Sequence, residues 1–328
     1  MMDVKQELAR MSKELDGAIK QYIKDDVPSN LIEACRQYPY AGGKRMRPAM
    51  VLSACGAVGG DKDKAVPLAV AIEYIHNFTL IHDDLMDGDE KRRGMTTSHV
   101  KYGMETAILA GDALFAKAYE IISFMDVPAE VIKKALQVIS VAVWDLARGQ
   151  QMDVNNENGN EVTMEEYIET IRLKTSVLFA AGAAGGALVG GADDKVVDAI
   201  HEYAMSLGVA FQMYDDILGI IGDPAKTGKS AGNDIRKGKS TVMVCHALKT
   251  LKGDDLAKFK AVLGKTDATE DEIAVARDIL KKNGSIDYAI DLATKYTKDA
   301  ISKLDVLEDS RDKEFMVALA EFAMARDV

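Results

Sequence analysis

Two groups of aspartates have the spacing that a divalent cation requires. Asp83 and Asp87 lie in the stretch LIHDDLMDGDEKRRG, directly after an apolar run. If residues 65–87 form one helix, these carboxylates share a face, with Cβ atoms roughly 5–6 Å apart. Magnesium prefers one or two carboxylates plus the phosphate oxygens of a substrate. The spacing therefore predicts a magnesium site that holds a diphosphate, with Asp84 in a supporting role. The motif alone also fits a solvated helix end.

A second acidic pair, Asp215 and Asp216, also follows an apolar helical run, GVAFQMYDDILGIIGDP. Adjacent like charges near a helix C-terminus oppose each other and the helix macrodipole, at a cost of roughly a few tenths of a kcal/mol each. Because this placement does not stabilise a helix, a cation between the two acidic helices explains it better. We expect both helices to direct their carboxylates at one another across an apolar cavity.

Basic clusters supply the complementary charge. In AGGKRMRPAM, two glycines free the backbone to bend toward an anion, and Pro48 begins a helix whose positive end faces it. Lys44 and Arg47 then complete a phosphate cradle, because both side chains donate to phosphate oxygens. A solvated basic loop is the alternative. Two further clusters comprise Lys91, Arg92 and Arg93, and then Lys226, Lys229, Arg236, Lys237 and Lys239.

The composition is that of a globular enzyme. The 328 residues are 48% hydrophobic and 28% charged. Lys plus Arg number 41 against 52 Asp plus Glu, and the net charge of −11 disfavours nucleic-acid and anionic-membrane partners. Three separated cysteines without CxxC spacing indicate buried free thiols. The apolar run at residues 177–192 is shorter than the roughly 20 residues that cross a bilayer, and the N-terminus lacks a signal-peptide core. We expect a cytoplasmic protein without a membrane span.

The chain is helical in pattern. Apolar residues recur at three and four positions through most of its length, and alternating strand patterns are absent. Capping boxes are expected at residues 163–166 and 269–272, and Asn283 with Gly284 is expected to close a helix. The six prolines are expected at helix starts or in connections. Since no linker or internal repeat interrupts the pattern, we predict one all-α domain over residues 1–328.

Taken together, these motifs resemble the trans-prenyl diphosphate synthases of the polyprenyl synthetase family. The resemblance runs in colinear order from about residue 40 to residue 245 and is highly specific as a set. Its motifs are GGKRMRP, DDLMD followed by RRG, GQQMD at residues 149–153, Lys174-Thr175, FQMYDD at residues 211–216 and GDPAKTGKSAGNDIRKGKST. It implies an orthogonal helical bundle around a deep central cavity, an archaeal-type short-chain enzyme and a homodimer.

The resemblance implies a role for each matching residue. Magnesium, three ions per active site, would be held by Asp83, Asp87 and Asp215, with Asp84 and Asp216 in support. The site for isopentenyl diphosphate would comprise Gly43, Lys44, Arg47, His76 and Arg93. The allylic diphosphate would be bound by Arg92, Lys174, Lys229 and Lys239, and its reacting end would be lined by Thr175 and Gln212. Without the resemblance, His76 would be interpreted as a satisfied core histidine.

Two positions depart from the family pattern. Gly219 stands where many members carry a third aspartate, which leaves the second acidic motif dependent on Asp215 and Asp216. Ser240 stands where a second lysine is frequent, which weakens the basic loop. A non-catalytic regulatory subunit of a heteromeric synthase would have lost more of these groups. A class I terpene cyclase would carry a different second motif.

The resemblance also indicates a product. Phe78 and Thr79 lie five and four residues before Asp83, and an aromatic residue followed by a small one at these positions resembles synthases that make geranylgeranyl diphosphate. The implied reaction condenses isopentenyl diphosphate with allylic diphosphates after magnesium-assisted ionisation. Farnesyl diphosphate, alone or mixed with the longer product, is the alternative. Without a role in chain length, Phe78 is interpreted as an ordinary core residue.

Overall fold

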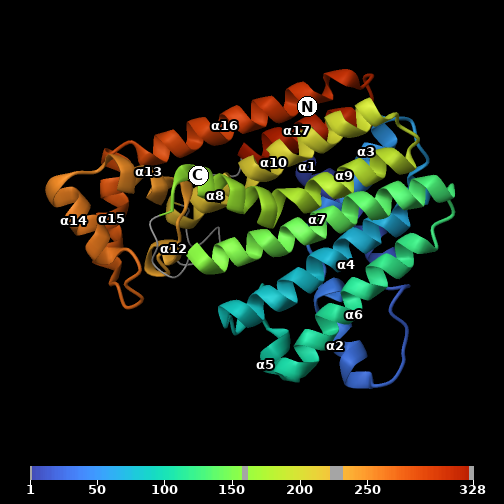
Figure 1. The fold of residues 1–328 in the computed structure, drawn as a ribbon, viewed down its shortest axis with the longest axis horizontal. Coiled ribbons are helices and arrows are strands. Elements are labelled where there is room, and N and C mark those ends of the chain that lie inside the picture. The colour runs from blue at the N-terminus through green and yellow to red at the C-terminus, as the bar shows by residue number, and fades with distance from the viewer. Residues whose placement is uncertain (1, 157–161, 222–231, 325–328) are drawn as a thin grey trace. The chain divides into compact units, whose positions relative to one another are not determined.

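The computed structural model describes residues 2–156, 162–221 and 232–324, most of which lie in helices (Figure 1). The expected all-α class is confirmed. Among the described residues, the strands are confined to one small hairpin, in which β1 (Lys91–Arg92) pairs antiparallel with β2 (Met95–Thr96).

The chain divides into two compact units. The first comprises Met1–Ser140, Ala181–His201 and Val306–Ala318, and the second comprises Val141–Ala180, Glu202–Asp305 and Leu319–Val328. Each unit draws on segments that are far apart in the sequence, so no linker in the sequence marks a boundary. The expectation of a single domain stays a prediction.

In the first unit, the helices pack around a long central helix, α4, which contacts α1, α3, α5 and α6. Asp61 caps the start of α4 by accepting a hydrogen bond from the Asp63 backbone N–H, and Gly88 ends the helix in the left-handed conformation with φ 66°. The helices wholly within this unit are α1 (Val4–Ile19), α2 (Ser29–Tyr40), α3 (Met46–Ala57), α4 (Lys62–Asp87), α5 (Ser98–Tyr102) and α6 (Met104–Ser123).

In the second unit, α13 contacts α8, α15 and α16, and α14 lies beside α15 (Figure 1). Its helices are α8 (Met164–Ile171), a π-helical turn (Arg172–Ser176), α12 (Asn233–Arg236), α13 (Val242–Thr250), α14 (Gly253–Val262), α15 (Glu270–Lys282) and α16 (Ser285–Lys303), which ends close to a 3-10 turn (Leu304–Val306). Helices with residues in both units are α7 (Ala129–Asn156), α9 (Val177–Val189), α10 (Asp194–Ile221) and α17 (Arg311–Met324).

The helix ends confirm most of the local predictions. Both capping boxes form, at the starts of α8 and α15, and Gly284 separates α15 from α16 with φ 74°. The prediction for prolines was wrong at two positions, because Pro39 and Pro67 lie inside α2 and α4. The buried apolar face of α4 outweighs the low helix propensity of Pro67, since packing routinely overrides propensity. Pro224 lies outside the described residues.

The small residues of α9 let backbones approach closely within the first unit, as the apolar run at residues 177–192 predicts. A Cβ atom added at Gly186 would overlap the Val51 carbonyl oxygen, and one at Gly185 would lie 2.8 Å from a Leu68 methyl carbon. Glycine is therefore needed at position 186, because the approach of α9 to the α3 backbone leaves no room there for a side chain, whereas at position 185 the Leu68 side chain could move.

Among the described residues, one helix, α10, is long and apolar enough to cross a membrane by length and composition alone, and 61% of its most apolar window is buried inside the protein. Such burial is typical of a core helix. The three cysteines are buried and free, as the sequence predicts. Burial raises the pKa of Cys35 and of Cys55 to about 11 and that of Cys245 to about 12.

Candidate active site

The first acidic motif occupies the last turns of α4. Asp83 and Asp87 belong to one helix at a spacing of four residues, which confirms the assumption behind the predicted metal pair. The backbone N–H groups of Gly88 and Asp89 both donate to the Asp84 carbonyl oxygen, so this residue anchors the end of the helix. The Asp83 side chain is 19% exposed and that of Asp84 is 1% exposed. The outer carboxylate is therefore reachable from solvent, and the inner one is not.

The hairpin after α4 brings Arg92 back onto this acidic end. Its Nε donates to Asp84 Oδ1 at 2.6 Å, and its Nη2 lies 3.4 Å from Asp83 Oδ2. Arg93 and Gly94 form the two-residue turn, with φ values of 52° and 78°. Such values at both central positions are those of the turn type that matches the twist of paired strands. The turn therefore places a guanidinium group beside the carboxylates.

A second cluster lies between α3 and the middle of α4. Arg47 Nη1 lies 3.3 Å from His76 Nε2, and Arg93 Nη1 donates to the Gly42 carbonyl oxygen at 3.1 Å. A Cβ atom at Gly43 would lie 2.8 Å from Arg93 Nη1, so a glycine is required for this approach. The structure thus brings together Gly43, Arg47, His76 and Arg93, which the resemblance assigns to one site, and Lys44 is exposed in the same loop.

Electrostatics keeps the histidine of this cluster neutral. Burial, followed by the Arg47 and Arg93 guanidinium groups, holds the pKa of His76 well below its usual value. A neutral imidazole beside two cations leaves the cluster positive without adding a further repelling charge. The cluster is therefore suited to an anion that brings its own negative charge.

Arg45, between Lys44 and Arg47, has a structural role instead. It adopts the left-handed conformation with φ 47° at the start of α3, and its side chain is buried. Its Nη1 donates to Glu73 Oε1 at 2.5 Å, and its Nη2 donates to Asp16 Oδ1 at 2.8 Å. A buried pair of this kind is destabilising to break, since either partner alone would be an unpaired buried charge.

In the second unit, one hydrogen-bonded chain joins the predicted residues of α10 to the π-helical turn. Gln212 Nε2 donates to Asp216 Oδ1 at 2.9 Å, and Thr175 Oγ1 donates to Gln212 Oε1 at 3.1 Å. Tyr167, from α8, donates to Asp216 Oδ2 at 2.8 Å. Burial raises the pKa of Asp216 to about 7, and the hydrogen bonds from Gln212 and Tyr167 counteract part of that rise.

Lys174 is paired with a carboxylate that the sequence interpretation left without a role. Its Nζ lies 2.6 Å from Asp153 Oδ2, so GQQMD contributes the partner of the lysine. Lys239 lies beyond α12, where its backbone N–H donates to the Asp234 carbonyl oxygen at 2.9 Å. The predicted contribution of Lys229 falls outside the described residues.

The space beside Gly219 is already filled. A Cβ atom at this position would overlap Asp234 Oδ2, and the Gly219 carbonyl oxygen accepts a hydrogen bond from the Gly232 N–H at 3.0 Å. Asp234 thus brings a carboxylate to the position where many family members carry a third aspartate. An aspartate at position 219 would require Asp234 to move.

The predicted chain-length residues form part of an aromatic wall in the first unit. The Phe78 ring packs edge to face against Phe115, with ring centroids 5.4 Å apart. Phe115 in turn packs against Tyr119 at 4.9 Å. The Thr79 hydroxyl donates to the His76 carbonyl oxygen at 2.7 Å, which turns its polar group onto its own helix. The Phe78 ring is therefore packed against the Phe115 ring.

The acidic groups suit magnesium better than a metal enclosed by protein ligands. Within the described residues, no group of three or more His, Cys, Asp or Glu side chains converges as a ready-made metal site. Two carboxylates at a spacing of four residues supply the partial ligand set that magnesium completes with water and phosphate oxygens. The residues present therefore fit an ion that arrives with a diphosphate.

Sequence reasoning missed three partners of these residues, namely Tyr38, Tyr167 and Asp153. The Tyr38 hydroxyl donates to Asp84 Oδ2 within the first unit, much as Tyr167 donates to Asp216 within the second. Neither tyrosine belongs to a charged motif, so no pattern in the sequence marks it. Asp153 is the last residue of the GQQMD motif, and its place in that motif is the sequence feature that could have marked it as a partner of Lys174.

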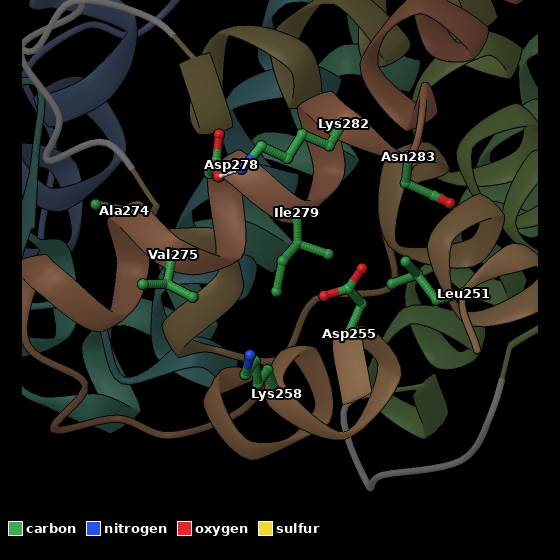
Figure 2. A pocket seen from close by; sticks show the side chains of 9 residues that line it. All are labelled: Leu251, Asp255, Lys258, Ala274, Val275, Asp278, Ile279, Lys282 and Asn283. Atoms are coloured by element: carbon green, nitrogen blue, oxygen red, sulfur yellow. Dashed lines mark ion pairs between the residues drawn. The ribbon is translucent and has the colours of Figure 1, made fainter. Parts of the chain in front are cut away.

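A pocket of about 550 Å³ lies apart from the predicted residues of the second unit, between α14 and α15 (Figure 2). Figure 2 shows Ile279 in its wall and the ion pair between Asp278 and Lys282, whose charged atoms are 2.5 Å apart. None of the residues assigned to the diphosphate or metal sites lines it. The pocket therefore adds nothing to the candidate site.

The fold and the charged groups define a class, that of all-α proteins with paired aspartates on helix ends and basic side chains beside them. The family model described as polyprenyl synthetase matches residues 28–280. The chain belongs to the polyprenyl synthetase family and is a prenyltransferase.

Relatives and solved structures agree over the full length. The chain is 41% identical to the geranylgeranyl diphosphate synthase of Methanosarcina mazei over 327 residues, which cover 100% of this chain and 99% of the relative. The crystal structure of geranylgeranyl pyrophosphate synthetase from Pyrococcus horikoshii matches with a TM-score of 0.94 and 41% identity, covering 99% of both chains. That of geranylgeranyl pyrophosphate synthase from Corynebacterium glutamicum, complexed with isoprenyl diphosphate and magnesium, matches with a TM-score of 0.85 and 26% identity over 98% of both chains.

Proposed function

We propose that the protein condenses isopentenyl diphosphate with allylic diphosphates and releases geranylgeranyl diphosphate as its main product. The observation that carries the proposal is the pairing of two unlike sites along α4. The acidic end with Arg92 suits a metal-held diphosphate, and the Arg47–His76 cluster suits a diphosphate bound directly. His76 is seven residues before Asp83, or roughly 10.5 Å along the helix. A reaction between two diphosphate substrates requires two such sites.

The acidic site would activate the allylic substrate. We propose three magnesium ions, for which Asp83 and Asp87 in the first unit and Asp215 in the second would be ligands. The bound metal would stabilise negative charge on the diphosphate oxygens. Arg92, Lys174, Lys229 and Lys239 donate to the departing diphosphate. Each preorganised donor of this kind typically contributes about 3 kcal/mol of transition-state stabilisation. Thr175 and Gln212 line the reacting carbon.

The basic cluster would hold the second substrate. Lys44, Arg47, Arg93 and neutral His76 fix the diphosphate of isopentenyl diphosphate, and Gly43 keeps the backbone close to it. The double bond attacks the allylic carbocation, and a proton then leaves to the released diphosphate. The apolar side chains below the aspartates exclude water from the cation.

Product length is set by the aromatic wall. Phe78 lies five residues before Asp83, which places it roughly 7.5 Å from Asp83 toward the N-terminus of α4. Because Phe115 holds the Phe78 ring at a centroid distance of 5.4 Å, a growing tail meets a rigid obstacle. The proteins from M. mazei and P. horikoshii are named as geranylgeranyl diphosphate and pyrophosphate synthases, which agrees with a 20-carbon product.

Product analysis tests the proposal. Purified protein supplied with dimethylallyl diphosphate and labelled isopentenyl diphosphate is expected to give a 20-carbon product on chromatography, and Phe78→Ser is expected to lengthen it because the obstacle is removed. Phe124→Ser is the matched control, since Phe124 is 82% exposed at the end of α6 and is not part of the ring cluster of Phe78, Phe115 and Tyr119. A 15-carbon product from the unaltered protein, or unchanged length in Phe78→Ser, would contradict the assignment. No condensation at all would contradict the proposed function and favour a regulatory subunit.

The protein is further proposed to work as a cytoplasmic homodimer. The α6 helix supports the homodimer, because Met104, Ile108 and Leu109 are 58%, 40% and 55% exposed on it. Contiguous exposed apolar residues mark interaction surfaces more often than isolated ones do.

A further inference from the structure

The two acidic pairs share a detail that their sequences do not show. In each pair, the second aspartate accepts a hydrogen bond from a tyrosine hydroxyl on one oxygen and from a nitrogen donor on the other. For Asp84 the donors are Tyr38 and Arg92 Nε, and for Asp216 they are Tyr167 and Gln212 Nε2. The arrangement recurs in each unit independently.

Both tyrosines reach their aspartate from a different helix. Tyr38 lies on α2 and is 3% exposed, and Tyr167 lies on α8 and is 4% exposed. A buried hydroxyl requires a partner, and in both cases the partner is the second aspartate of a pair. Burial raises the pKa of each phenol, so both remain protonated donors at neutral pH.

The hydrogen-bonded aspartates, Asp84 and Asp216, restrain the helical turns that carry Asp83 and Asp215. Asp84 also accepts the closing hydrogen bonds of α4 on its carbonyl oxygen, so Tyr38 secures the turn that bears Asp83 and Asp87. Asp216 joins α10 through Gln212 to Thr175, so Tyr167 secures the turn that bears Asp215. Neighbouring side chains on a helix point in different directions, about 100° apart at 3.6 residues per turn. Holding the second carboxylate therefore restrains the helical turn from which the first aspartate side chain projects.

We propose that Tyr38 and Tyr167 are positioning residues, which hold the second aspartate of each pair so that Asp83 in the first unit and Asp215 in the second are each oriented to bind a metal ion. The inference rests on the proposed function, because it assumes that these aspartates bind the metal. It assigns no contact between either tyrosine and the substrate. Each hydroxyl acts through the carboxylate that it holds.

The test replaces each tyrosine by phenylalanine, which removes only the hydroxyl. The readout is the affinity for Mn²⁺ in the presence of inorganic diphosphate, measured from the electron paramagnetic resonance signal of free Mn²⁺. Tyr38→Phe and Tyr167→Phe are each expected to weaken binding about tenfold, which corresponds to about 1.4 kcal/mol. The Mn²⁺ concentration for half-maximal prenyl transfer is expected to rise in parallel.

Two other buried tyrosines provide matched controls. Tyr74 donates to the Ile19 carbonyl oxygen at 2.6 Å, and the Tyr214 hydroxyl lies 3.2 Å from Thr294 Oγ1. Their phenylalanine variants lose a comparable buried hydrogen bond without touching an aspartate. Tyr74→Phe and Tyr214→Phe are therefore expected to unfold at a lower temperature but to bind Mn²⁺ and diphosphate as the unaltered protein does.

The outcomes separate the inference from the proposed function. Unchanged Mn²⁺ affinity in Tyr38→Phe and Tyr167→Phe, or equal losses in the two controls, would overturn the positioning role while leaving the prenyltransferase assignment intact. If the unaltered protein neither binds Mn²⁺ with diphosphate nor transfers prenyl groups, the proposed function and this inference are both overturned.

Discussion

At the residue scale, the first aspartate pair divides into an outer carboxylate, Asp83, and an inner one, Asp84, whereas in the second pair Asp216 is the carboxylate held by two hydrogen bonds. Asp84 and Asp216 each accept a hydrogen bond on both carboxylate oxygens, so both carboxylates are already engaged within the protein, and burial raises the pKa of both, that of Asp216 to about 7. The Asp83 side chain is more accessible, and only the weaker of the two Arg92 contacts, at 3.4 Å, reaches it. The pairs therefore combine one residue suited to bind a metal with one suited to hold the helix.

The first aspartate of each pair is tested by replacement with asparagine. Asp83→Asn and Asp215→Asn keep the shape of the side chain but remove its charge, and we expect prenyl transfer to fall at least about a hundredfold in each, as when a single electrostatic contribution to the transition state is lost. Initial rates at saturating substrate give the measurement. Asp126→Asn, a change at an exposed site between α6 and α7, should retain full activity. Near-normal rates in Asp83→Asn or Asp215→Asn would refute the metal assignment.

The residue types of the site could be predicted from the sequence, but their partners could not. Paired aspartates and clustered basic residues are visible because their charge is unusual beside an apolar run. Tyr38 and Tyr167 are 46 and 49 residues from the aspartates that they hold, and an ordinary helical tyrosine carries no local signal. Such contacts follow from packing between helices, which spacing within one helix does not determine.

At the element scale, the long helices could be predicted from the sequence, whereas the short irregular segments could not. The helix that carries Asp83 could be predicted, and so could the capping boxes that begin α8 and α15, because apolar periodicity and cap residues are local signals. The hairpin that places Arg92 could not, since two-residue strands have no periodicity and its turn uses Arg93 rather than the usual Asn or Asp before glycine. The π-helical turn with Lys174 and Thr175 also has no sequence pattern.

The close approach of α9 to α3 provides a test of an element. In Gly186→Ala, the added methyl group would overlap the Val51 carbonyl oxygen, a backbone atom that cannot rotate away. We expect a loss of about 1–3 kcal/mol in the free energy of unfolding, partly offset by the helix propensity of alanine. Denaturant titration followed by circular dichroism gives the value.

Gly17→Ala in α1 is the control for that change, because a Cβ atom there would have no other atom within 4 Å. This variant is expected to be as stable as the unaltered protein, or more stable by about 0.5–1 kcal/mol. If both variants changed stability alike, the tight packing of α9 would not be the cause.

At the scale of the whole molecule, the net charge opposes the proposed substrates. A charge of −11 repels diphosphates at long range, so binding must depend on local cations: Lys44, Arg47, Arg92 and Arg93 within the first unit, together with the metal. That long-range repulsion is screened by salt, since the Debye length is about 8 Å at physiological ionic strength. Whether both acidic pairs face one cavity stays a prediction from the sequence.

The proposed homodimer gives the last prediction. Light scattering after size exclusion is expected to report twice the chain mass of 35.6 kDa, because burying the exposed side chains of Met104, Ile108 and Leu109 removes apolar surface from water. Leu109→Glu should shift the mass toward 35.6 kDa, since a carboxylate would be buried at the interface without a partner. Val275→Glu, at a 48% exposed position on α15, should remain dimeric. A monomeric mass for the unaltered protein would refute the dimer, and a dimeric Leu109→Glu would move the interface away from α6.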